Sequence, residues 1–242
     1  MQIKVKELIS FVIPTFNEAS HIVDSLEKLI KFISKYNHEI IIVDDGKDNT
    51  FELINDFKKK SLNEIKIIKG NRKGKGAGVK LGLLEAKGEI VFYLDSDLTI
   101  PLENIDIFIE EIRNSNYDIV IGKRILSLKD KSFARIIFSL ILLIIGRLFV
   151  FHSNYFYDTQ CGFKAFKRDS VKKLISKQQV DGGMFDLELM YIAKLHSMKI
   201  SQIVVTPLPE IRKSVLRLGV CMWKDPLDLF FIKVNRIIGR YN

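Results

Sequence analysis

Short apolar runs alternate with amphipathic stretches through the first half of the chain. After the first run, Ile22, Leu26, Leu29 and Ile33 recur at the spacing of one helical face. Short apolar strands that alternate with helices are typical of a mostly parallel sheet covered on both faces. The sequence therefore predicts an α/β fold of this kind. The predicted strands are residues 8–13, 39–43, 65–68, 90–94 and 117–121.

Polar residues follow the predicted strands where each one ends. Asn17 and Glu18 come after the first strand, Asp45 after the second, and Asp95 and Asp97 after the fourth. Ligands of open α/β sheets bind outside the carboxyl ends of parallel strands. We therefore expect one binding site along this edge of the sheet.

The segment Asp95-Ser96-Asp97 directly follows an apolar run. Residues i and i+2 of an extended segment point the same way, so both carboxylates can reach one ion. Mg²⁺ and Mn²⁺ prefer oxygen ligands and are commonly held by one or two carboxylates plus substrate phosphates. A solvated turn that caps a helix near Pro101 is the alternative. The other polar strand ends favour the metal, so we expect Mg²⁺ or Mn²⁺ as the cofactor.

Residues 70–78, here called the glycine-rich loop, precede a predicted helix. Backbone N–H groups at a helix N-terminus and the side chain of Lys75 suit a phosphate. The loop is not a Walker A motif, because no Ser or Thr follows the lysine. It is not the dinucleotide motif either, because Val79 occupies the place of the last glycine. A solvated basic turn is the alternative.

The polar residues after the first two strands could either bind a ligand or cap the helix that follows. Asp44 or Asp45 could accept hydrogen bonds from a base or ribose, or could cap the next helix. Asn17 could cap the helix that contains Ile22, and this role is compatible with a place in the site.

Composition and charge narrow the class of protein. The 242 residues, 47% hydrophobic and 28% charged, suit one globular domain over residues 1–242. The net charge of +9 favours polyanionic partners: nucleic acid, phosphorylated small molecules or an anionic membrane. Cys161 and Cys221 form no disulfide framework and no metal-ligand spacing, which favours a reducing, cytosolic setting. The segment 1–7 has no apolar core of a signal peptide, so we expect none.

As a set, the motifs resemble those of glycosyltransferase family 2, whose members have the GT-A fold. The donor-side motifs are Pro14-Thr15-Phe16-Asn17-Glu18, Asp44-Asp45-Gly46, Asn71 to Gly76, and Asp95-Ser96-Asp97. Later motifs resemble the polyprenyl-phosphate hexosyltransferases, most of all the dolichyl-phosphate glucosyltransferases. They are Gly122-Lys123-Arg124, Asp158-Thr159-Gln160-Cys161-Gly162-Phe163-Lys164 and Phe185-Asp186-Leu187-Glu188.

The resemblance implies inverting transfer of a hexose from a nucleoside-diphosphate sugar to polyprenyl or dolichyl phosphate. UDP-glucose is the first choice of donor and GDP-mannose the second. The implied donor-binding residues are Pro14, Phe16, Asn17, Glu18, Asp45, Asn71, Lys75 and Asp95, with Asp95 and Asp97 on the metal. The implied acceptor-phosphate residues are Arg124, Lys164, Arg212, Lys213 and Arg217. Asp97, Arg124 and Asp158 are the expected catalytic residues, with Asp158 positioning the metal or acceptor.

Two segments, 133–151 and 225–240, predict helices at a membrane interface. The uncharged stretch 136–146 is well short of the ~20 residues that a span needs, and a crossing would separate Asp158 from Asp95. In the second segment basic residues flank an apolar helical face, which suits an anionic bilayer surface. Packing against the protein core is the alternative. We expect a membrane-associated protein at the cytoplasmic face. The apolar face comprises Leu227, Phe230, Phe231, Val234, Ile237 and Ile238.

Two other classes of function have weaker support. A nucleotidyltransferase also combines a basic glycine-rich loop with carboxylates and a metal, but it leaves the segment 158–163 without a role. A basic nucleic-acid-binding module has only the net charge of +9 in its favour. We therefore expect a nucleotide sugar, a lipid phosphate and a membrane surface as partners, and no nucleic acid.

Overall fold

A computed structural model describes residues 7–61, 64–125, 158–208 and 218–242. The strands are β1 (Leu8–Thr15), β2 (Asn37–Asp44), β3 (Ile65–Lys69), β4 (Ile90–Leu94), β5 (Ile119–Arg124), β6 (Phe163–Lys167) and β7 (Ile200–Val205). The helices are α1 (Ile22–Ile33), α2 (Thr50–Lys60), α3 (Lys75–Glu85), α4 (Asn104–Asn114), α6 (Arg168–Lys177), α7 (Phe185–Leu195) and α8 (Leu218–Ile237).

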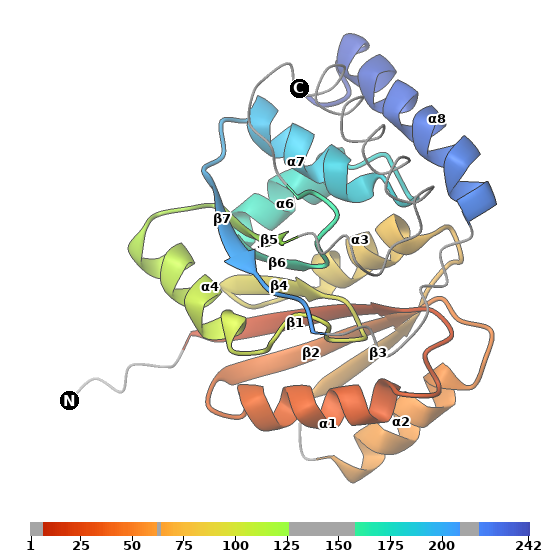
Figure 1. The fold of residues 1–242 in the computed structure, drawn as a ribbon, viewed down its shortest axis with the longest axis vertical. Coiled ribbons are helices and arrows are strands. Elements are labelled where there is room, and N and C mark those ends of the chain that lie inside the picture. Colours follow the sequence, from red (N-terminus) through yellow and green to blue (C-terminus); the bar gives the residue numbers. More distant parts are fainter. Residues whose placement is uncertain (1–6, 62–63, 126–157, 209–217) are drawn as a thin grey trace.

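The strands form one mixed sheet in the order β3-β2-β1-β4-β6-β5-β7, with helices on both faces (Figure 1). Strands β1 to β4 are parallel to one another, and β7 is parallel to β5. Strand β6 runs antiparallel between β4 and β5. The predicted mostly parallel sheet is therefore confirmed, with one reversed strand that joins its two halves.

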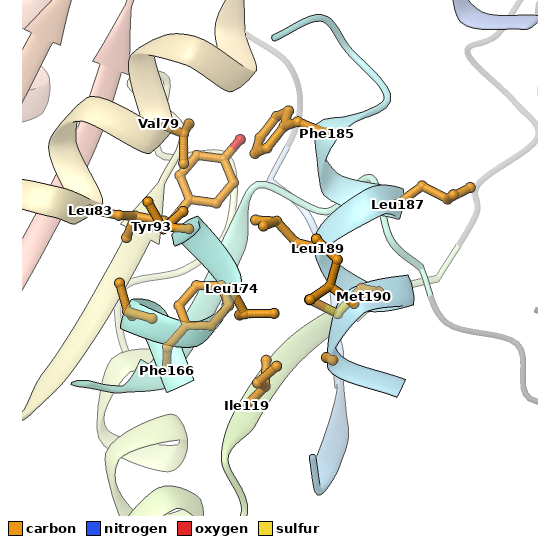
Figure 2. Packing of buried hydrophobic residues seen from close by; sticks show 14 of the residues in the cluster. Val79, Leu83, Tyr93, Ile119, Phe166, Leu174, Phe185, Leu187, Leu189 and Met190 are labelled. Carbon is orange, nitrogen blue, oxygen red and sulfur yellow. The ribbon is translucent and has the colours of Figure 1, made fainter. Parts of the chain in front are cut away.

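The central strands of the sheet are buried under helices on both faces, which explains why β4 is apolar throughout. In β4, Val91 and Tyr93 belong to the core on one face, whereas Ile90, Phe92 and Leu94 belong to the core on the other. The first core includes buried residues of α3, α6, α7 and α8, and the second those of α1, α2 and α4. Figure 2 shows the first core, with Tyr93 between the side chains of α3 and Phe185 of α7.

The predicted elements of the first half are found at their expected places, because each has a clear apolar period. The helix expected near Pro101 is α4, which begins three residues later, at Asn104. The predicted helix 225–240 overlaps α8, which begins earlier and includes Pro226. The segment 133–151 lies outside the described residues. None of the described helices has the length and apolar content needed to cross a bilayer.

Candidate active site

The carboxyl ends of β1, β2 and β4 meet at one edge of the sheet. Strand β1 lies between β2 and β4, so the strand order reverses there: β2 and β3 lie on one side of β1, and β4 lies on the other. This is the switch point at which open α/β sheets bind ligands. Backbone hydrogen bonds connect the strand ends: Asp45 N donates to Thr15 O at 3.0 Å, and Gly70 N to Asp44 O at 2.8 Å. The predicted gathering of polar strand ends is therefore present.

Asn17 connects the turn after β1 to the turn after β2. Its Oδ1 accepts from the backbone N–H of Lys47 at 2.7 Å, and its φ is 57°, in the left-handed region that Asn tolerates. Of the two roles left open for Asn17, capping of α1 is excluded, since the N-cap of α1 is His21. The side-chain oxygen of Asn17 instead accepts a hydrogen bond from the turn after β2. Phe16, at 49% exposure, lies beside it on the surface.

The two aspartates after β2 differ in role. Asp44 is buried and accepts from Thr15 Oγ1 at 2.8 Å. Burial raises the pKa of Asp44 in spite of that hydrogen bond. Asp45 accepts from the backbone N–H of Arg72 at 3.0 Å, which fixes the glycine-rich loop against β2. Neither aspartate caps α2, whose N-cap is Asn49.

The glycine-rich loop lies close to Asp45 and leads into α3. A Cβ on Gly70 would lie 1.8 Å from Asp45 Oδ1, so a larger residue there would displace the Asp45 carboxylate. Gly74, the N-cap of α3, has φ 133°, which L side chains rarely adopt. Lys75 follows at the first helical position, where free N–H groups point outward. The loop therefore has the backbone form of an anion site.

Lys75 faces the end of β4. Its Nζ lies 2.7 Å from Asp95 Oδ1, and the hydroxyl of Tyr93 donates to the same oxygen at 3.2 Å. Burial lowers the pKa of Lys75, but Asp95 and Asp186 raise it by more, so the net shift is upward. The lysine therefore stays charged between the carboxylates and the glycine-rich loop. Exposed Asn71, earlier in that loop, accepts from Lys73 N at 3.2 Å.

Asp95 and Asp97 together suit a divalent cation that is completed by phosphate oxygens. Desolvation, followed by the charge of Asp95, raises the pKa of Asp97, as expected for two carboxylates that share one place. No cluster of three or more His, Cys, Asp or Glu side chains that could hold a metal is found among the described residues. Two carboxylates plus a substrate diphosphate is a common Mg²⁺ arrangement, so the donor set fits that ion.

Arg124 and Asp158 form a two-point ion pair at the far side of β6. Arg124 Nε and Nη2 donate to the two carboxylate oxygens at 2.8 and 2.9 Å. Burial alone would raise the pKa of Asp158, but the hydrogen bonds and charge of Arg124 lower it by more. A carboxylate held ionised in this way is a weak base. The remaining guanidinium N–H groups of Arg124 can still bind an anion.

Lys164, which was expected to bind the acceptor phosphate, is buried and paired with other protein groups. Its side chain is fully buried, and its Nζ lies 2.5 Å from Asp186 Oδ1 and 2.5 Å from the carbonyl of Cys161. A phosphate could not bind it without displacing Asp186, so the geometry favours a structural role for Lys164 in the interior. The other expected acceptor residues, Arg212, Lys213 and Arg217, lie outside the described residues.

Asp186 and Tyr93 belong to the site, although sequence reasoning gave them no role. Asp186 is buried beside Lys164, and its charge raises the pKa of Lys75. Both acidic residues of the otherwise apolar run 185–193 are buried. Acidic residues are almost never fully buried without partners, and this signal could have identified Asp186 and Glu188.

Residues 10–175 match the profile described as "Glycosyl transferase family 2". The chain belongs to this family. It is 32% identical to a dolichyl-phosphate beta-glucosyltransferase of Trichomonas vaginalis, covering 96% of this chain and 74% of that protein. It is 26% identical to the human dolichyl-phosphate beta-glucosyltransferase, covering 96% of this chain and 77% of that protein. An uncharacterized protein of Methanocaldococcus jannaschii is 29% identical, with 85% of this chain and 96% of that protein covered.

Solved structures of other glycosyltransferases have the same fold. Mannosyl-3-phosphoglycerate synthase from Rubrobacter xylanophilus matches with a TM-score of 0.71 at 16% identity, over 97% of this chain and 75% of that one. Glucosyl-3-phosphoglycerate synthase from Mycobacterium tuberculosis, crystallised with Mn²⁺, UDP-glucose and phosphoglyceric acid, matches with a TM-score of 0.68 at 15% identity. That match covers 94% of this chain and 80% of that one. The predicted GT-A fold is confirmed.

Proposed function

We propose that this family 2 glycosyltransferase moves glucose from UDP-glucose to dolichyl phosphate, or to a closely related polyprenyl phosphate, at a membrane surface. The observation that carries the proposal is the position of Asp95 between two anion-binding regions. On one side Lys75 and the glycine-rich loop face it. On the other, Asp95 N donates to Gly162 O at 2.9 Å, in the turn that joins Asp158 to β6. The similarity to dolichyl-phosphate beta-glucosyltransferases supports the choice of sugar and lipid.

The donor half is assigned to the nucleotide sugar. Asp45 and Asn17, between the turns after β1 and β2, border the place for the nucleoside, and the glycine-rich loop and Lys75 receive the diphosphate. Asp95 and Asp97 would hold a divalent ion, which would act as a Lewis acid on the departing nucleoside diphosphate. Lys75 adds a fixed positive charge at the place where negative charge develops.

The acceptor half is assigned to the lipid phosphate. A phosphate monoester has a second pKa of about 6, so near neutrality it is mostly a dianion and needs little help from a general base. The lowered pKa of Asp158 agrees with this, because a strongly ionised carboxylate removes protons poorly. Arg124 would orient the acceptor phosphate, while Asp158 fixes the plane of its guanidinium. Attack opposite the leaving diphosphate would invert the sugar, which gives a β-linked product from an α-linked donor.

The exposed face of α8 is assigned to the membrane. Its buried face holds Leu229 and Ile232, and Phe230 and Phe231 point away at 63% and 54% exposure. The basic residues Lys233, Arg236 and Arg240 border the exposed apolar face and suit anionic lipid headgroups. The exposed apolar residues of this segment are Leu227, Phe230, Phe231, Ile237 and Ile238. Peripheral association at the cytoplasmic face would bring the acceptor phosphate to the sheet edge.

Purified protein incubated with labelled nucleotide sugars, Mn²⁺ and vesicles that contain dolichyl phosphate tests the proposal. We expect a labelled glucolipid from UDP-glucose that is stable to mild base and cleaved by mild acid. Labelled lipid from GDP-mannose in place of UDP-glucose would show a mannosyltransferase. Label in no lipid, together with transfer to a soluble acceptor, would contradict the proposed acceptor.

A further inference from the structure

The glycine-rich loop is held from outside by residues 178–182, here called the bracing segment. The side-chain Nε2 of Gln178 donates to Gly76 O at 3.0 Å, and Ala77 N donates to Asp181 O at 3.2 Å. A Cβ on Gly74 would lie 2.6 Å from Asp181 O, which shows how closely the two segments lie. The direction in which the loop presents its amides therefore depends on where the bracing segment lies.

The bracing segment is held in turn by Glu188 of α7. Both carboxylate oxygens of Glu188 accept from Gln179 N, at 3.0 and 3.1 Å, and one also accepts from Val180 N at 2.8 Å. Glu188 itself has no exposed surface. Toward α8 the bracing segment borders a cavity of about 260 Å³, and its packing on that side is limited to a few close approaches such as that of Gly182 to Asp228. The hydrogen bonds of Glu188 therefore add to the restraint on the backbone of this segment.

Glu188 is oriented by Tyr241, which follows α8 in the sequence. The buried hydroxyl of Tyr241 donates to Glu188 Oε1, and its ring packs edge-on against Tyr191 with centroids 6.1 Å apart. The backbone carbonyl of Tyr241 lies 2.8 Å from His196 Nε2, which fixes the end of the chain against α7. Burial raises the pKa of Tyr241, so the hydroxyl keeps its proton and remains a donor.

We propose that Glu188 and Tyr241 are positioning residues for donor binding. Tyr241 orients Glu188, Glu188 fixes the bracing segment, and that segment holds the glycine-rich loop in the form that receives a diphosphate. The carboxylate of Glu188 and the hydroxyl of Tyr241 thereby influence the affinity for the nucleotide without touching it. The inference rests on the proposed function, because it takes the glycine-rich loop as the diphosphate site.

The conservative variant Tyr241→Phe tests this inference, since it removes one hydroxyl and keeps the ring contact with Tyr191. Titration calorimetry with UDP and Mn²⁺ measures the affinity of the glycine-rich loop directly. We expect binding about three- to tenfold weaker than in the wild type, as for the loss of one ordinary intramolecular hydrogen bond. In the transfer assay the KM for UDP-glucose should rise by a similar factor, while the KM for dolichyl phosphate stays unchanged. Glu188→Gln should weaken UDP binding further.

Ser10→Ala is a matched control, because Ser10 Oγ also donates to a buried carboxylate, that of Glu39, and lies near the start of β1. Both variants should lose some thermal stability, and only Tyr241→Phe should lose UDP affinity. Equal UDP affinity in wild type and Tyr241→Phe, with a loss of stability like that of Ser10→Ala, would show a merely structural role and overturn the inference. Wild-type protein that binds no UDP would contradict the proposed function itself, and this inference with it.

Discussion

The two halves of the sheet build their parts of the site in different ways. Around β1 to β4, polar side chains at strand ends bind backbone groups of neighbouring turns, as Asn17 and Asp45 do. Around β5 to β7, ionised groups are paired with one another in or near the interior, as in Arg124–Asp158 and Lys164–Asp186. The first arrangement leaves an open edge for a large donor. The second fixes the reversed strand β6 and α7 against that edge and places charge where an acceptor phosphate would arrive.

The largest expected effect is on the donor half. Asp97→Ala should reduce transfer by at least about a hundredfold, because the carboxylate is assigned to the ion that stabilises the leaving diphosphate. The fold should survive, since removal of one of two neighbouring carboxylates relieves repulsion. Transfer rates and circular dichroism measure the two effects. Asp169→Ala, which removes a carboxylate at 88% side-chain exposure, is the control. Wild-type activity of Asp97→Ala in the presence of EDTA would rule out the metal assignment.

The seam between the halves should be the next most sensitive place. A Cβ on Gly162 would lie 1.9 Å from Asp95 Oδ2, so Gly162→Ala must displace either the carboxylate or β6. We expect a loss of about 2–3 kcal/mol in the free energy of unfolding, measured in urea, together with a loss of activity. Gly183→Ala is the control, because its Cβ would meet an ordinary contact at 3.6 Å. Equal stability of the two variants would contradict this prediction, because it would show that the Asp95 carboxylate moves aside at little cost.

The membrane assignment belongs to the second half alone. Replacing Phe230 and Phe231 with Ser should move the protein from vesicles to the soluble fraction, since each ring contributes about 1.5–3 kcal/mol when buried. UDP binding should be unchanged. Ile107→Ser, at 48% exposure on α4, controls for the loss of exposed apolar surface elsewhere. Unchanged vesicle binding with a collapsed fold would show that the two rings are core residues in solution.

Arg124→Lys separates the acceptor from the donor. Lysine cannot reproduce the two-point contact with Asp158 or a planar contact with phosphate. We therefore expect the KM for dolichyl phosphate to rise about tenfold, and more than the KM for UDP-glucose. Steady-state kinetics with each substrate varied in turn measure both constants. A change confined to the KM of UDP-glucose would move Arg124 to the diphosphate site.

These two halves were also predicted unequally well from the sequence. In the first half each strand has a continuous apolar run, and polar residues follow the point where the run ends. Asp45, Lys75 and Asp95 could therefore be placed at one edge of the sheet from the sequence. In the second half Lys164 was expected to bind the acceptor phosphate, because the sequence does not show that Asp186 reaches it from a helix 22 positions later. Pairing of buried charges is set by tertiary contacts, which leave no period in the sequence.

The smallest expected effect concerns pH and lies in α8. Burial, together with the charge of Asp228, raises the pKa of Asp225 to about 6. The folded state therefore binds this proton more tightly than the unfolded state, in which the pKa is about 3.9. The contribution of Asp225 to the free energy of unfolding falls as pH rises from about 4 to about 6, and it is lowest above pH 6. Asp225→Asn should thus be more stable than wild type at pH 7.5, by about 1 kcal/mol after solvent screening, and nearly equal at pH 4. A stability difference that does not change with pH would contradict this assignment.

The metal dependence of UDP binding by the wild-type protein tests most directly whether Asp95 and Asp97 hold a divalent ion together with the donor diphosphate. Asp95 and Asp97 alone offer too few protein ligands for a tightly held ion. The diphosphate must therefore supply further ligands to the ion, and the ion in turn strengthens binding of the diphosphate. Calorimetric titration of UDP in Mn²⁺ and again in EDTA measures this coupling. We expect UDP to bind at least about tenfold more weakly in EDTA than in Mn²⁺, whereas uridine, which lacks the diphosphate, should bind equally in both. Equal affinity for UDP in Mn²⁺ and in EDTA would contradict it.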